Sequence, residues 1–215
     1  MIYVHHHLGL GDHIACAAMV RELYKKFPHL ELAVKKRNYS SVRHLFTDLD
    51  ITYHLVETDH DCIPRYFTKP TLRIGHERCR LDWEKSFYNQ LGMDYSIRYD
   101  NFYLQRDHNR EKSLEDNLDL PEKYCFVCDT TSEQTYDIPI QSNLPKVKLE
   151  PITDSIFDWV GVIEKATEIH TVDTSVFQLI KQLGLDSKKV FYDVGRTTPP
   201  TFEDNSWETI SYNKL

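Results

Sequence analysis

The sequence predicts an α/β protein built from two small Rossmann-like domains, each with a mostly parallel sheet. Strand-like and helix-like segments alternate along most of the chain, which is typical of a parallel sheet covered by helices. A polar and charged stretch at residues 94–121 interrupts this alternation. We therefore expect an N-terminal domain over residues 1–118 and a C-terminal domain over residues 119–215. A single larger sheet is the alternative architecture.

The N-terminal half is expected to contain four strands and three helices. Apolar residues at helical spacing between Ile14 and Leu23 predict the first helix, and Pro28 is expected to end it. The expected strands are residues 1–8, 31–36, 51–57 and 71–76, and the expected helices are residues 14–27, 41–49 and 81–92.

The alternation resumes after the polar stretch, which itself reads as a connection plus a helix. Cys125 and Cys128 form a CxxC pair in YCFVCD, but no second pair accompanies them, so a buried strand is favoured over a zinc site. The expected strands are residues 124–129, 146–152, 168–173, 189–194 and 207–212, and the expected helices are residues 156–166 and 175–184.

Composition limits the classes of function. Apolar residues make up 40% of the 215 residues, enough for a packed core, and the net charge of −7 argues against nucleic acid as a partner. No apolar run approaches the ~18 residues of a membrane-spanning helix, and the first residues do not resemble a signal peptide. Five cysteines without framework spacing indicate free thiols in a reducing compartment. We expect a cytoplasmic protein.

The first motif is LGLGDHI, at the turn between the first expected strand and helix. Gly9 and Gly11 permit a tight turn and the close approach of a substrate to the backbone. Ile14 occupies the third glycine position of a dinucleotide fingerprint, so NAD binding is not favoured. Asp12 places a carboxylate where the positive end of a helix attracts anions. It either caps the helix or takes part in chemistry.

The second motif lies in residues 162–202, where a strand ending at Asp173 leads into a helix through Thr174 and Ser175. The free N–H groups of a helix start form an anion site suited to a diphosphate. No acidic residue follows in the first turn, which leaves the positive end of the helix available to a ligand. The alternative is an ordinary N-cap before a core helix.

Together the two motifs resemble those of GT-B glycosyltransferases of the heptosyltransferase type. In that family an "lGD" loop precedes a helix near the N-terminus, and a later "vDTG…HLA…lG…vlFG…P" block binds the nucleotide-sugar diphosphate. The corresponding stretches here are LGDH, and VDTSVFQLIKQLG followed by VFYDVGRTTPP. Ser175 stands where the family has glycine, and Phe177 and Gln178 stand where it has His-Leu. The resemblance covers residues 1–30 and 155–202.

The resemblance implies transfer of a sugar from a nucleotide-sugar donor, as co-substrate, to a glycan or glycolipid hydroxyl, without a metal or another cofactor. Asp12 matches the family's loop aspartate and would act as the catalytic base. His13 would join Asp12 in catalysis, His7 and Gly9 would lie on the acceptor side, and Gly11, Thr130, Thr131, Ser132, Asp173, Thr174, Ser175 and Arg196 would bind the donor. For His7 and His13, a satisfied core or surface histidine is the alternative.

Two other functions stay open at this point. Asp59-His60-Asp61 matches the DxD pattern by which GT-A glycosyltransferases hold a divalent metal and a diphosphate. A module that binds a nucleotide sugar without turnover is the second. The run His5-His6-His7 makes a poor metal triad by itself, because successive residues of a strand point to opposite faces.

Overall fold

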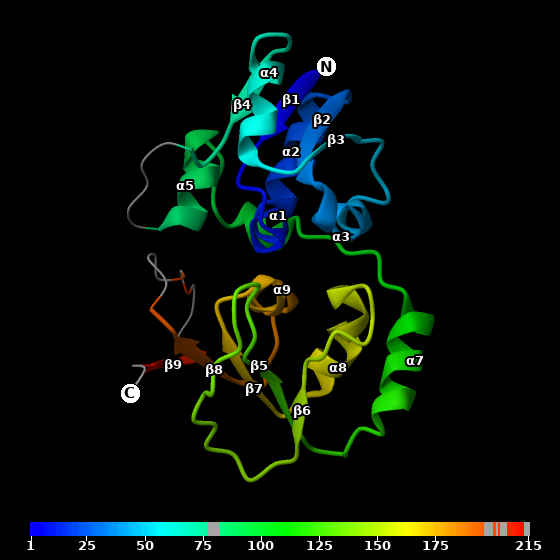
Figure 1. The fold of residues 1–215 in the computed structure, drawn as a ribbon, viewed down its shortest axis with the longest axis vertical. Coiled ribbons are helices and arrows are strands. Elements are labelled where there is room, and N and C mark those ends of the chain that lie inside the picture. The colour runs from blue at the N-terminus through cyan, green and yellow to red at the C-terminus, as the bar shows by residue number, and fades with distance from the viewer. Residues whose placement is uncertain (77–81, 196–199, 201, 203–205, 213–215) are drawn as a thin grey trace. The chain divides into compact units, whose positions relative to one another are not determined.

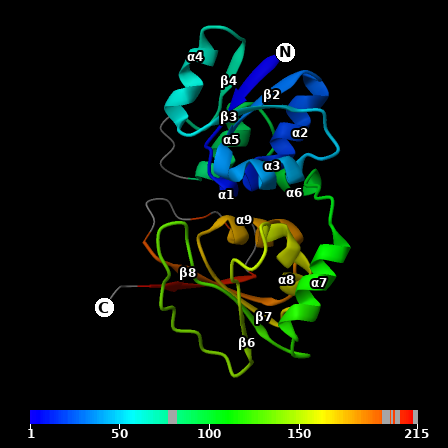
Figure 2. The same cartoon turned by 45° about the vertical axis from the view of Figure 1, so that its right-hand side comes forward.

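The computed structural model describes residues 1–76, 82–195, 200, 202 and 206–212. It divides into two compact units, Met1–Gln105 and Arg106–Leu215, each with its own parallel sheet and helices (Figures 1 and 2). The predicted α/β class with two parallel sheets is confirmed, and the alternative of one larger sheet is wrong. The division falls ahead of the predicted boundary between residues 118 and 119, because helix α7 (His108–Leu118) packs on η3 and α8 of the second unit.

The sheet of the first unit has the strand order β3-β2-β1-β4, and all its pairings are parallel. Tyr3 of the inner strand β1 is in register with Glu31 of β2 and Thr71 of β4. The strands are β1 (Ile2–His5), β2 (Leu30–Lys35), β3 (Thr52–Val56) and β4 (Thr71–Arg73). Because the strands run in one direction, the segments that follow them begin at one edge of the sheet.

The helix after β1 begins earlier than predicted. It starts at Leu10 rather than Ile14, and α1 (Leu10–Ala15) and α2 (Ala17–Lys26) follow one another with only Cys16 between them. The prediction placed both glycines in the turn, but Gly11 belongs to the helix. The other helices of this unit are η1 (Lys36–Asn38), α3 (Tyr39–Leu45), η2 (Asp59–Cys62), α4 (Ile63–Tyr66), α5 (Trp83–Gln90) and α6 (Ile97–Asp100).

A buried ion pair fixes the end of the first unit. Glu84 of α5 and Arg98 of α6 form an ion pair, and both side chains are 0% exposed. The Tyr95 hydroxyl donates to Glu84 Oε2 at 2.8 Å and accepts from Arg98 Nη1 at 2.7 Å. Buried charges are stable only when they are paired and hydrogen-bonded. This network explains why much of the polar stretch after residue 94 packs as part of the first unit.

The second sheet has the order β6-β5-β7-β8-β9, again with parallel pairings throughout. Its strands are β5 (Cys125–Cys128), β6 (Lys146–Lys148), β7 (Glu168–Val172), β8 (Lys188–Asp193) and β9 (Trp207–Ser211). Cys125 and Cys128 are both buried in β5, as the strand prediction required.

The two faces of the second sheet are covered differently. One core combines Phe126 and Ile169 of the sheet with Leu114 of α7 and Ile180 of α9. The other includes the loop residues Tyr136 and Ile138 packed near Tyr192, so an extended segment covers that face. The helices after α7 are η3 (Ile156–Trp159), α8 (Val160–Lys165) and α9 (Ser175–Leu183). Within the described ranges, no helix combines the length and apolarity that crossing a bilayer requires.

Candidate functional site

Asp12 lies in the first turn of α1, directly after the carboxyl end of β1. The N-cap of this helix is Gly9, in an extended conformation with φ −70° and ψ 149°, and it makes no side-chain cap. Asp12 is not the N-cap residue itself but the third helical residue, and a helix-stabilising role for it stays open beside the catalytic one. Its half-buried carboxylate lies at the positive end of the helix, which favours the ionised form. An ionised carboxylate at the edge of the sheet is able to accept a proton from a ligand.

Gly9 leaves room for that carboxylate. A Cβ atom built on Gly9 would lie only 2.5 Å from Asp12 Oδ2, a distance that real Cβ atoms do not adopt. The absence of a side chain at Gly9 thus sets where the Asp12 side chain rests. The acceptor-side place that the resemblance implied for Gly9 stays a prediction; in the structure Gly9 is the direct neighbour of the candidate base.

His13 does not lie where a substrate reaches it. Its side chain is fully buried against His6, with the ring centroids 4.5 Å apart, and both of its ring nitrogens lack a hydrogen-bond partner among the described residues. Burial, reinforced by the nearby His6, holds the pKa of His13 well below its ordinary value. The catalytic role of His13 stays a prediction that its burial disfavours, and His13 also differs from the satisfied core histidine that was the alternative, because neither ring nitrogen has a hydrogen-bond partner among the described residues.

His7, in contrast, is exposed beyond the end of β1. Its Nε2 hydrogen-bonds with the carbonyl oxygen of Gly75 at 2.8 Å, and its ring lies 5.1 Å from that of His76 and 5.3 Å from that of Phe87. These contacts fix the ring at the surface of the first unit. A place on the acceptor side remains a prediction for His7.

The structure brings the predicted donor residues of the second unit to one edge of the sheet. β5 and β7 are adjacent and parallel, so the loop after Cys128 and the turn after Val172 begin side by side. Cys128 Sγ lies 3.6 Å from the Thr174 hydroxyl, which links the two turns directly. Thr174 is the N-cap of α9, and its hydroxyl accepts from the backbone N–H of Phe177 at 3.2 Å. Ser175 and the rest of the first turn carry no acid.

The hydroxyls after β5 mostly support their own turn. Thr131 Oγ1 accepts from the backbone N–H groups of Glu133 and Gln134, each at 3.2 Å, and Thr130 Oγ1 lies 3.0 Å from Thr135 Oγ1. Ser132 is exposed. Donor binding by these three residues stays a prediction. Arg196 lies outside the described residues.

In the Asp59-His60-Asp61 stretch the two carboxylates have different partners. Asp61 Oδ2 accepts from the backbone N–H groups of Glu57 and Thr58, at 3.0 and 2.8 Å, and so closes the first turn of η2. Asp59 instead directs Oδ1 toward His5 Nε2, at 3.3 Å. Each carboxylate thus has a separate structural partner, and metal binding by Asp59 and Asp61 together, the basis of the GT-A alternative, stays a prediction.

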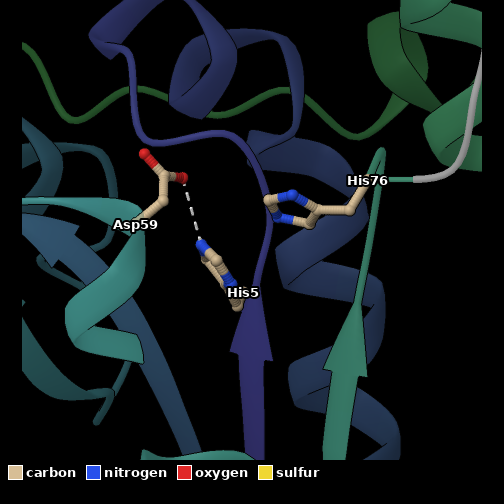
Figure 3. A group of neighbouring side chains, drawn as sticks. All are labelled: His5, Asp59 and His76. Atoms are coloured by element: carbon tan, nitrogen blue, oxygen red, sulfur yellow. Dashed lines mark hydrogen bonds and ion pairs between the residues drawn. The ribbon is translucent and has the colours of Figure 1, made fainter. Parts of the chain in front are cut away.

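Sequence reasoning missed a cluster of His5, Asp59 and His76 (Figure 3). One ligand atom from each lies within 4.8 Å of the others. Burial lowers the pKa of His5, and burial together with the neighbouring histidines lowers the pKa of His76 to about 4. Burial raises the pKa of Asp59, but the hydrogen bond from His5 and the charge of Lys35 lower it more, and the net result is below the ordinary value. At neutral pH the cluster is two uncharged rings and one carboxylate.

The cluster escaped notice because its members are far apart in the chain. His5 ends β1, Asp59 follows β3 and His76 follows β4, and parallel pairing carries all three to one edge of the sheet. The available signal was that His5 and His76 lie within two of the expected strands of this half, residues 1–8 and 71–76, and that Asp59 follows a third, residues 51–57.

A scan against models of protein families found no match to the sequence, and a search of curated proteins found none. The structure is similar to a solved one, described as the glycosyl transferase family 9 from Veillonella parvula DSM 2008. That similarity has a TM-score of 0.63 at 9% sequence identity and covers 100% of this chain and 87% of that chain. At this identity the likeness shows the fold, so the chain has a GT-B-like α/β fold with two parallel sheets.

Proposed function

We propose that this protein is a glycosyltransferase that moves a sugar from a nucleotide-sugar donor to a hydroxyl of a glycan or glycolipid. The observation that carries the proposal is the place of Asp12. It lies in the first turn of the helix after β1, in a chain whose fold is similar to that of a glycosyl transferase over 100% of its length. Ligands of open α/β sheets bind outside the carboxyl ends of the strands, where this turn begins.

In the proposed step, Asp12 takes the proton of the acceptor hydroxyl while that oxygen forms a bond to C1 of the sugar. The bond between C1 and the diphosphate oxygen breaks, and the nucleoside diphosphate leaves with the bonding electrons. A single displacement of this kind inverts the configuration at C1. Asp12 suits the role of base because its half-buried side chain is a carboxylate, which is able to accept a proton, and because it lies in the first turn of α1.

The leaving diphosphate needs positive charge near it. We assign this role to the start of α9, where free N–H groups and the helix dipole favour an anion. Two observations support the assignment. The first turn of α9 carries no acid, and the loop after β5 begins beside the turn before α9, because β5 and β7 are adjacent and parallel. The step so described needs no metal and no cofactor other than the nucleotide sugar.

A panel of nucleotide sugars and free nucleoside diphosphates, screened by thermal unfolding, tests the proposal first. A donor present at 100 times its Kd should add ~2.7 kcal/mol to the free energy of unfolding. Transfer or slow hydrolysis of the stabilising donor should then be seen by release of the nucleoside diphosphate. Stabilisation without release, with every acceptor class tried, would instead identify a nucleotide-sugar-binding module. If no nucleotide stabilises the protein, the glycosyltransferase proposal fails.

A further inference from the structure

We infer that His5, Asp59 and His76 form a binding site for a divalent transition-metal ion such as Zn²⁺ (Figure 3). The inference goes beyond the proposed transfer reaction, for which no metal is invoked. Two imidazole nitrogens and a carboxylate oxygen are a common ligand set for zinc and related ions, and three protein ligands leave a position for water or a substrate oxygen.

The distances fit this chemistry. Ligand atoms around a tetrahedral zinc ion, at about 2.0–2.2 Å from the metal, lie roughly 3.3 Å from one another. His5 Nε2 and Asp59 Oδ1 are already 3.3 Å apart. The third atom, from His76, lies within 4.8 Å of both. The His76 ligand atom would have to move closer by up to about 1.5 Å to complete this geometry.

Each ligand is oriented by a neighbour. His5 Nδ1 contacts the Tyr66 hydroxyl. When an ion replaces the proton that Nε2 shares with Asp59, the ring keeps its single proton on Nδ1 and donates it to Tyr66. This is the outer-shell arrangement that metal-binding histidines usually have. The His5 side chain is 1% exposed and the Asp59 side chain is 48% exposed, so the cluster is buried at His5 and open to solvent at Asp59.

The turn that carries His76 is equally well fixed. Gly75 has a φ of +79°, and a Cβ there would meet the ring of Phe87 at 2.0 Å, so only glycine fits. The Gly75 N–H donates to Gln90 Oε1 at 2.9 Å, and Gln90 Nε2 donates to the Arg73 carbonyl at 2.6 Å. Nε2 of His76 is itself buried and has no hydrogen-bond partner among the described residues. An unsatisfied buried nitrogen costs free energy that a bound ion would offset.

The charges around the cluster select the kind of ion. Asp59 supplies one negative charge, and Lys35 lies 3.7 Å from its Oδ2. Among its three ligands the cluster has only one carboxylate. This disfavours Mg²⁺ and Ca²⁺, which need several oxygen ligands. Imidazole nitrogens favour zinc, nickel, cobalt and copper.

A second group of Cys125, Glu168 and His170 has ligand atoms equally close together but differs in its sulfur ligand. Its histidine resembles His5, with the Tyr192 hydroxyl at one ring nitrogen, 2.9 Å away, and the Glu168 carboxylate at the other, 3.4 Å away. Burial raises the pKa of the Cys125 thiol to about 11, whereas a metal binds the thiolate. That group is best explained as a satisfied hydrogen-bond network.

The test uses the whole chain, freed of metal by chelation and dialysis, and titrated with Co²⁺ while its visible absorption is recorded. One equivalent should bind, and Zn²⁺ should displace it while Mg²⁺ should not. Asp59→Asn and His76→Ala should each weaken binding by at least tenfold, because even the loss of an outer-shell partner costs about 10–100-fold. His60→Ala is the matched control, since His60 is exposed and outside the cluster, and it should bind as the wild type does.

Asp59 is half exposed, so Asp59→Asn is expected to fold, and circular dichroism of each variant checks this. The inference is overturned if the wild type binds no Co²⁺, or if Asp59→Asn and His76→Ala bind it as tightly as His60→Ala does. Loss of binding on Cys125→Ala alone would also overturn it. None of these outcomes bears on sugar transfer, because no transfer is measured.

Discussion

The side chain of Asp12 folds back over the α-carbon of Gly9, so that a methyl group on Gly9 would lie 2.5 Å from Asp12 Oδ2. The two residues belong to one helix start, with Gly9 as the N-cap and Asp12 in the first turn. The position of the proposed base therefore depends on a residue that has no side chain of its own.

Gly9→Ala should displace the Asp12 carboxylate without unfolding the protein. The extended conformation of Gly9 suits alanine, and the clash is with the end of a side chain, which is able to rotate. We expect a stability cost of about 1 kcal/mol or less and a fall in kcat of up to about 10²-fold, as for other misplaced catalytic groups. In an Asp12→Asn background the same change should cost no further activity. An equal loss in both backgrounds would show that Gly9 acts through something other than Asp12.

Asp12→Asn keeps the size of the side chain and removes its ability to accept a proton. The variant should fold and bind the donor as before, while kcat falls by about 10²–10⁴-fold, the usual contribution of a positioned base. Asp50→Asn, an exposed acid of the same unit, is the control and should leave kcat unchanged. Wild-type turnover by Asp12→Asn would leave Asp12 with only a helix-stabilising role.

Most elements could be predicted from the sequence, whereas the geometry around them could not. Apolar periodicity marked the helix after β1 from Ile14 onward but did not show its first turn, because Leu10 and Gly11 carry no periodic signal. The short helices η2 and α4, Asp59–Cys62 and Ile63–Tyr66, were not predicted, since an acidic run and a proline favour a loop. The partnership of Asp59 with His5 depends on which strands are neighbours, and no local pattern encodes that.

Burial of the uncharged His13 should make the protein less stable in acid. In the unfolded chain a histidine binds a proton near pH 6.5, whereas the folded-state pKa of His13 lies well below this, through burial and through His6, His5 and Lys35. The contribution of the uncharged His13 to the free energy of unfolding is thus fully present above pH 6.5. It is lost as the pH falls toward the folded-state pKa of His13. The expected slope is up to ~1.4 kcal/mol per pH unit for this group.

The measurement is urea unfolding at a series of pH values between 7 and 4, for the wild type and for His13→Leu. Leucine removes both unpartnered ring nitrogens at similar volume, so the variant should lose less stability over this range. His6 remains in both proteins, and burial lowers its pKa to about 3, so it contributes equally to the two curves. Parallel curves would show that His13 does not titrate differently in the folded and unfolded states.

Ser175 allows the start of α9 to be tested as a diphosphate site against its role as a helix terminus. Ser175→Glu places an acid in a first turn that has none, which should stabilise the helix by about 0.3–1 kcal/mol. The same charge should repel a bound diphosphate and weaken nucleoside diphosphate binding. Loss of a charged hydrogen bond, about 1.5–3 kcal/mol, corresponds to roughly 10–150-fold in Kd.

Stability and affinity should therefore change in opposite directions, which no simple unfolding effect produces. Ser175→Gln is the matched control, because glutamine has nearly the size of glutamate without its charge. This variant should bind the nucleotide with an affinity closer to that of the wild type. Thr174 keeps its cap on Phe177 in both variants, so the helix start itself is preserved. Calorimetric titration with the nucleoside diphosphate, beside thermal unfolding of the same samples, gives both quantities. Should Ser175→Glu stabilise the protein and bind the nucleotide as well as Ser175→Gln does, the start of α9 is a helix terminus only and the diphosphate must bind elsewhere.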